Sequence, residues 1–123
     1  MATARLLLKE HHLFACVNRL YYACLFAVSA LLLKNGLRSS RHAGVQALFN
    51  KHYVRAGHVP KEMGTLLSTL FDARQESDYA DMVEFDEAEV AQWLAEASGF
   101  VSTVERLVAG DSPPGGSSEA CKA

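Results

Sequence analysis

The sequence has few cysteines, the residues whose disulfide bonds stabilise small secreted domains. Only three of its 123 residues are cysteine, and three are proline. Cys16 and Cys24 would lie about 12 Å apart along one helix, which is beyond the reach of a disulfide bond. Cys121 falls in a polar tail near the end of the chain. These spacings exclude a disulfide framework and predict reduced thiols in a cytoplasmic protein.

The sequence also lacks an apolar run of full membrane-spanning length. Its longest run, residues 20–33, is shorter than the roughly 20 residues that a spanning helix needs. Extending the run toward the N-terminus adds Arg19 and Asn18, and a central arginine costs about 2.5–3.5 kcal/mol on insertion scales. We therefore expect no membrane segment. Residues 18–33 are apolar nearly all round a helix, so neighbouring helices or a second copy should bury them.

Acidic residues are missing from residues 11–61, which hold seven lysines and arginines and all five histidines. Residues 62–123 have the opposite balance, with thirteen acidic residues and three basic ones, and the whole chain has a net charge of −2. Such a split favours either a basic surface for an anion such as RNA, or two halves of one bundle whose charges attract. The sequence leaves both interpretations open.

Common catalytic signatures are absent as well. The chain has no glycine-rich phosphate loop, no HExxH helix and no CxxC pair. His11 and His12 are adjacent, so they would point to different faces of a helix. His42, His52 and His58 have no matching cluster of carboxylates. We expect neither a metal nor a cofactor.

Helical periods, separated by glycine, proline and serine, run through most of the chain. The predicted helices are residues 3–10, an apolar helix that ends near Asn35 and Gly36, a third capped by Ser39 or Ser40 and continuing to Ala56, a fourth from about Lys61 to Asp81, and a fifth starting at Asp86. Short loops and no strand pattern predict an all-α, up-and-down bundle of about five helices. We expect one domain over residues 1–110, followed by a disordered tail over residues 111–123 that is rich in proline, glycine and serine.

Two polar clusters interrupt the apolar pattern. Arg19, Tyr21 and Tyr22 stand at the start of the apolar helix. Arg74 and Asp78, four residues apart, fall on the apolar stripe of the fourth predicted helix, where they can pair. Because desolvation offsets the attraction of a buried ion pair, such a pair adds little net stability. It therefore fits an interface or a polar groove as well as a lock within the core.

Three segments together resemble a known family. They are, in order along the chain, NRLYYACLFAVSALLLKNGL, SRHAGVQALFNKHYVRAG and LFDARQESDY. Their order and spacing are similar to those of the HEPN domain in its bacterial and archaeal branch. The resemblance implies a small bundle of about five helices that is usually a homodimer. It also implies a minimal nucleotidyltransferase as partner, in a pair of the toxin–antitoxin type.

The resemblance bears on catalysis too, because many HEPN proteins are metal-independent ribonucleases that use an arginine and a histidine near a helix end. Arg74 matches the arginine of that motif, but Tyr79 occupies the position of the histidine. A phenol with a pKa near 10 is poorly suited to proton transfer near neutral pH. The sequence therefore leaves open whether the protein is an enzyme. His42 would replace the missing histidine only if folding brings it near Arg74.

Two functions follow from the residues and the resemblance together. The first is a dimeric HEPN protein of the toxin–antitoxin type that binds a nucleotidyltransferase, a nucleotide or RNA. Its predicted binding residues are Arg19, Tyr22, Arg41, His42, Lys51 and Arg55. The alternative is an active endoribonuclease toxin that cuts single-stranded RNA, with Arg74, Asp78 and Tyr79 at its centre. The resemblance also makes Tyr79 a candidate acceptor of a nucleotidyl group, which mass spectrometry after incubation with the partner and ATP would detect.

Overall fold

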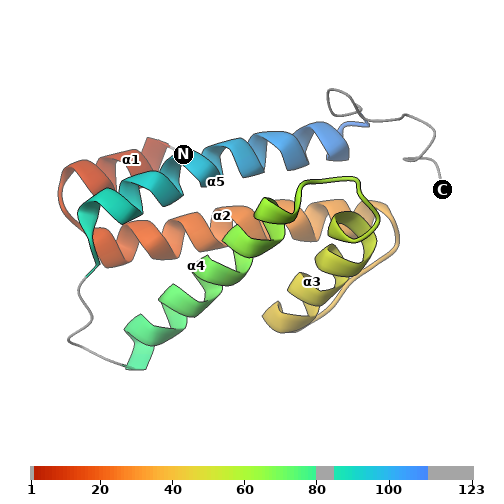
Figure 1. Cartoon of the computed structure of the whole chain (residues 1–123), viewed down its shortest axis with the longest axis horizontal. Helices are drawn as coiled ribbons and strands as arrows, with labels where there is room; N and C mark the ends of the chain where they lie inside the picture. Colours follow the sequence, from red (N-terminus) through yellow and green to blue (C-terminus); the bar gives the residue numbers. More distant parts are fainter. Residues whose placement is uncertain (1, 80–84, 111–123) are drawn as a thin grey trace.

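The computed structural model describes residues 2–79 and 85–110, and of residues 76–79 the backbone alone. Within these residues the chain is helical, without a strand (Figure 1). The helices are α1 (Ala2–Lys9), α2 (Leu13–Lys34), α3 (His42–Phe49) with a π-helical continuation η1 (Asn50–Val54), α4 (Lys61–Tyr79) and α5 (Glu87–Val108). The predicted all-α bundle of five helices is confirmed.

Helix α2 is the centre of the bundle. Figure 1 shows it running through the middle, with α1 and α5 on one side and α4 and α3 on the other. It packs most extensively against α5, then against α4 and α1. Its side chains supply much of the core, where these residues are buried: Cys16, Val17, Leu20, Tyr21, Cys24, Leu25, Val28, Leu31 and Leu32. The apolar helix of the sequence is therefore the inner helix of the fold.

One side of α2 nevertheless stays open in the single chain. Phe26 is 63% exposed and Leu33 is 57% exposed, and Ala30 between them is exposed as well. Neighbouring helices of the same chain therefore do not bury residues 18–33 completely, because they leave this stripe bare, and burial by a second copy stays a prediction. The helix begins at Leu13, so it includes residues 13–17 ahead of the apolar run.

Helix α2 is also the described helix that comes nearest to a membrane-spanning segment. Among the described residues, α2 alone is long and apolar enough to cross a membrane, and half of its most apolar 18-residue window is buried inside the fold. The core helix of a bundle meets the same criteria of length and composition.

The two described cysteines are unpaired and buried on α2. Burial raises the pKa of the Cys24 thiol to about 12, and burial also raises the pKa of Cys16, whose sulfur donates a hydrogen bond to the Ala4 carbonyl at 3.4 Å. Both thiols are therefore protonated near neutral pH and are poor nucleophiles. They act as small apolar side chains that join α1 to α2.

The carboxyl end of α2 joins three elements. Gly36 has a φ of +75°, the left-handed conformation predicted for the residue that ends this helix. Lys34 donates from Nζ to the carbonyls of Leu107 and Val108, at 3.2 Å and 2.7 Å, and so caps the last turn of α5. Asn35 donates from its side-chain amide to the Tyr53 hydroxyl in η1.

The start of α3 differs from its prediction. Neither Ser39 nor Ser40 caps the helix, which begins at His42 after Arg41. The Ser39 hydroxyl instead exchanges hydrogen bonds with the backbone of Arg41, an alternative that serine side chains commonly offer to the chain before a helix. His42 is therefore in the first turn of α3. At the other end, the regular helix predicted to continue to Ala56 widens into the π-helical η1.

The last two helices start as predicted. Helix α4 begins at Lys61, and its backbone is described to Tyr79, so the predicted end at Asp81 lies outside the described residues. The Asp86 side chain accepts a hydrogen bond from the Ala88 amide at 3.3 Å, which caps α5 as its sequence predicted. The tail over residues 111–123 also lies outside the described residues, so the domain boundary at residue 110 remains a prediction.

Leu32 and Leu33 are adjacent leucines of α2 in opposite environments, 1% and 57% exposed. We expect Leu32→Ala to lower the free energy of unfolding by about 2–5 kcal/mol, because it leaves a cavity in the core. Leu33→Ala, its matched control, should change that free energy by no more than about 0.5 kcal/mol. Urea denaturation of both variants measures the difference. Equal, large losses would contradict the single-chain fold and show that something outside the chain covers Leu33.

Candidate functional site

Arg74 is half-buried on α4 and faces α2. Its Nε donates a hydrogen bond to the side-chain oxygen of Asn18 at 2.9 Å. Its guanidinium carbon lies 5.1 Å from the centre of the Tyr22 ring and 5.9 Å from that of Tyr21. Cation–π contacts of this kind are worth about 0.5–2 kcal/mol each. The arginine is thus held by one amide and two aromatic rings of the same helix.

The position of Arg74 follows from the helical period of α4. Leu67, Leu70 and Ala73 are buried on the face that packs toward the core. Arg74 comes one turn after Leu70 and two turns after Leu67, so it continues the same face. A guanidinium there leaves water only in part, and polar and aromatic partners compensate part of the lost hydration.

Tyr21 is the buried member of the pair, with no exposed surface. Burial raises the pKa of its hydroxyl to about 12, although the positive charge of Arg74 lowers that pKa in part. The hydroxyl makes no hydrogen bond with the described residues. Tyr21 is therefore a neutral aromatic support near neutral pH rather than an acid or base.

His42 reaches the same two rings from α3. The centre of its imidazole lies 5.8 Å from that of Tyr21 and 5.9 Å from that of Tyr22, nearly perpendicular to the latter. In Figure 1, α3 and α4 lie on the same side of α2, and they move apart toward the first turn of α3 and the last turns of α4. The fold thus brings His42 and Arg74, which are far apart in the sequence, against one tyrosine pair. We call Asn18, Tyr21, Tyr22, His42 and Arg74 the Arg74 centre.

The chemistry of the Arg74 centre suits an anion with several oxygens. A guanidinium offers a planar fork of N–H donors that matches phosphate, and an imidazole is a further donor. Within the described parts of the chain, no group of three or more histidine, cysteine, aspartate or glutamate side chains is arranged to hold a metal. The side chains of Asp78 and Tyr79 lie outside the described residues, so their predicted roles stay predictions.

The other predicted binding residues differ in their position relative to this centre. Arg19 and Arg41 are exposed and stand next to Asn18 and His42 in the sequence. Lys51 and Arg55 are exposed in and just after η1, about two and a half helical turns or more beyond His42. Of the predicted set, Arg41 and His42 are therefore at the start of α3, and Lys51 and Arg55 are at the opposite end of the segment formed by α3 and η1.

The contact between η1 and α4 confirms this separation. A side chain at Gly64 would place its first carbon 2.5 Å from the Asn50 oxygen, so glycine permits η1 to approach the first half of α4. Arg74 lies ten residues farther along α4, about 15 Å down the helix axis. Basic residues of η1 thus stand near the opposite end of α4.

Three residues of this region, Asn18, Tyr21 and Phe26, were not among the predicted site residues, although Tyr21 belonged to a polar cluster noted in the sequence. Asn18 accepts a hydrogen bond from Arg74. The sequence indicated it only as a polar amide residue at the edge of an apolar run. Phe26 follows Tyr22 by four residues, and their ring centres lie 5.5 Å apart. The spacing indicated one helix face, but it did not indicate that this face stays open.

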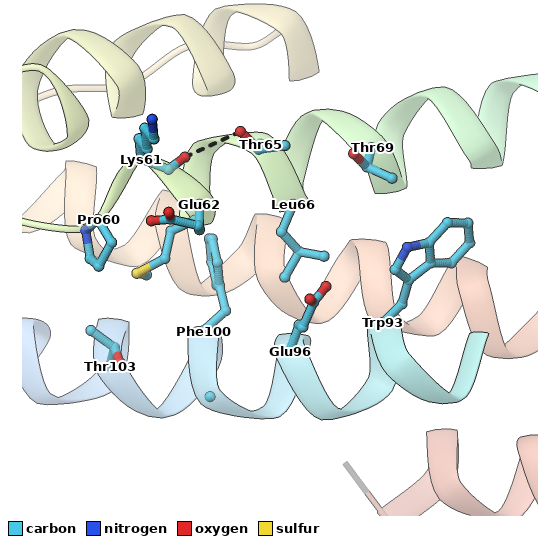
Figure 2. Close-up of a pocket in the computed structure, with 12 residues that line it drawn as sticks. Pro60, Lys61, Glu62, Thr65, Leu66, Thr69, Trp93, Glu96, Phe100 and Thr103 are labelled. Carbon is cyan, nitrogen blue, oxygen red and sulfur yellow. Dashed lines mark hydrogen bonds between the residues drawn. The ribbon is translucent and has the colours of Figure 1, made fainter. Parts of the chain in front are cut away.

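A separate groove of about 500 Å³ lies between the first half of α4 and α5. Figure 2 shows Leu66 directed into it from α4, and Trp93, Glu96 and Phe100 directed into it from α5. It shares no residue with the Arg74 centre, and no predicted site residue lines it.

The geometry defines a class of protein: an all-α bundle whose fourth helix presents a half-buried arginine to the tyrosines of the central helix. The chain matches the family model described as "HEPN domain" over residues 1–107. A UPF0332 protein of Thermotoga maritima is 46% identical over 105 residues, which cover 85% of this chain and 80% of the relative.

Two proteins of Methanocaldococcus jannaschii that carry the name "Putative toxin" are more distant. They are 26% and 29% identical to this chain, over 87% and 88% of its length and 72% and 80% of their own. The family match covers most of the chain, so the protein belongs to the HEPN domain family. The resemblance carried by three sequence segments is confirmed.

Proposed function

We propose that this HEPN-family protein is a toxin-like component of a two-protein system, in which the Arg74 centre binds a phosphate of a nucleotide or of single-stranded RNA. Family membership and the two relatives named as toxins support the toxin-like part. One observation supports the binding part above all: Arg74 and His42, from two different helices, lie against the same two tyrosines.

The partners in this proposal are a second copy of the chain and a minimal nucleotidyltransferase. The family resemblance supports both. The position of Tyr79 in the last turn of α4 keeps it a candidate acceptor for that partner.

Removing the guanidinium should remove the binding. We expect Arg74→Ala to weaken the affinity for a fluorescent single-stranded RNA oligonucleotide about tenfold or more, since a hydrogen bond to a charged group is worth about 1.5–3 kcal/mol. The affinity of Arg74→Lys should lie between those of Arg74→Ala and the unsubstituted protein, because lysine keeps the charge and loses the planar fork of donors. Fluorescence anisotropy measures the affinities, and circular dichroism confirms that each variant is folded.

The matched control is Arg106→Ala, which removes an arginine near the end of α5 whose guanidinium bonds Thr103. It should leave the affinity unchanged. Equal affinities of Arg74→Ala and the unsubstituted protein would contradict the assignment of the site. The proposal as a whole would be overturned if the protein is a monomer that binds no nucleotide, no RNA and no partner nucleotidyltransferase.

A second candidate function is metal-independent cleavage of single-stranded RNA, and the position of His42 favours it. In this reading Arg74 stabilises the charge that develops on the phosphate. Proton transfer falls to an imidazole, which suits neutral pH, rather than to Tyr21, whose pKa is raised to about 12. His42 would thereby supply from α3 what the motif lacks at Tyr79.

Cleavage assays separate this candidate from binding alone. If the protein is a ribonuclease, His42→Ala should lower the cleavage rate about 10²–10⁴-fold, the usual contribution of a general acid or base. The matched control is His52→Ala, because His52 is in η1 at the other end of the same helical segment. This variant should cleave RNA at the normal rate. Full cleavage and full growth inhibition by both His42→Ala and Arg74→Ala would rule this candidate out.

A further inference from the structure

Phe26 is the most exposed large apolar side chain of the described residues, with 63% of its surface open. It stands one helical turn after Tyr22, and the two rings are inclined by 34° with centres 5.5 Å apart. Neither the predicted site nor the proposed phosphate binding gives it a role. An exposed phenylalanine is ordinary when it stands alone, but Phe26 continues the aromatic cluster that holds Arg74.

The ring beneath Phe26 is held in place by the fold. Tyr22 makes edge-to-face contacts with Tyr21 at 5.2 Å and with His42 at 5.9 Å, and the Arg74 guanidinium lies 5.1 Å from its centre. Tyr21, in turn, is fully buried and contacts Phe71 at 5.8 Å. Phe26 therefore stands on a row of rings that extends from the core to the surface.

Among the described side chains, two arginines border this surface, Arg19 and Arg74. Arg19, Tyr22 and Phe26 are spaced by three and four residues, which places them along one face of α2. Arg19 is exposed at one end of that face, and Arg74 and His42 border Tyr22. Aromatic rings beside cationic groups are the combination that binds single-stranded nucleic acid.

We infer that Phe26, supported by Tyr22, stacks on an unpaired base of a single strand whose adjacent phosphate is bound by Arg74 and His42. The inference rests on the proposed function and deepens it, since it names the ligand as a base-bearing single strand rather than any phosphate. Every base has a π-face that can stack on an aromatic ring, so this contact should tolerate different base sequences. A duplex does not meet it, because its bases are already stacked and paired.

The test measures three ligands against matched variants: a single-stranded RNA oligonucleotide, the corresponding duplex, and inorganic tripolyphosphate as a competitor without bases. We expect Phe26→Ala to weaken single-strand binding about tenfold, within the range for loss of one stacked base. Tripolyphosphate should compete equally well in Phe26→Ala and the unsubstituted protein. Phe26→Trp, which keeps an aromatic surface, should restore the single-strand affinity.

Leu33→Ala is the control, because Leu33 is a second large apolar residue that is exposed on the same helix. It should leave all three affinities unchanged. An oligonucleotide with 2-aminopurine gives a direct readout, since its fluorescence should be quenched by the unsubstituted protein and less by Phe26→Ala. Phe26 and Leu33 are exposed, so folding should be kept in these variants.

The outcomes separate the inference from the function on which it rests. If Arg74→Ala weakens the single strand and Phe26→Ala does not, stacking is overturned and phosphate binding stands. If neither substitution matters, or the protein does not bind the strand, both are overturned. If Phe26→Ala changes the sedimenting species from dimer to monomer and Phe26→Trp fails to restore binding, a second copy covers Phe26 and the inference is wrong.

Discussion

The burial of α2 is the constraint on which the rest of the structure depends. This helix is too apolar to face water on more than one side, so α1, α4 and α5 must pack around it. Each fully buried aliphatic side chain contributes about 1.5–3 kcal/mol, which makes the arrangement of its neighbours hard to change. Because α3 and α4 both contact α2, residues far apart in the sequence meet at its surface. Arg74 and His42 meet at Tyr21 and Tyr22 for this reason.

The Arg74 centre stands where apolar packing gives way to polar groups, and it carries a cost. The Tyr21 hydroxyl is buried without a hydrogen bond to the described residues, and an unsatisfied buried group costs about 1–3 kcal/mol. Phenylalanine would avoid that cost. Local rules of packing are commonly broken at functional sites. The same cluster also holds a guanidinium half out of water, which gives two independent reasons to regard this edge of α2 as the candidate site.

Much of the scaffold could be predicted from the sequence, because it depends on local signals. The apolar period located α2, α4 and α5, Gly36 marked the end of α2, and Asp86 marked the start of α5. Arg74 was found because a charge entered an apolar stripe. These signals operate within one helix, where the spacing of residues and their direction are known.

The remaining features depend on how helices sit relative to one another. The contact of His42 with the tyrosines requires α3 to begin at His42 and to pass close to α2 there. The sequence predicted a serine cap for this helix, whereas the Ser39 hydroxyl bonds the backbone of Arg41 instead. Periodicity could not show which side of α2 stays bare, so the exposure of Phe26 was missed. The basic residues of the first half appeared as one set, whereas the fold divides His42 from Lys51 and Arg55.

An NMR titration with a short single-stranded RNA oligonucleotide tests most directly whether the edge of α2 is the binding site. If RNA binds there, the side-chain signals of Arg74, His42 and Tyr22 should shift together, along one binding curve. The indole signal of Trp93 in the α4–α5 groove and the signals of Lys51 should stay unchanged. Shifts confined to Trp93 or to Lys51, with Arg74 and His42 unaffected, would contradict the account.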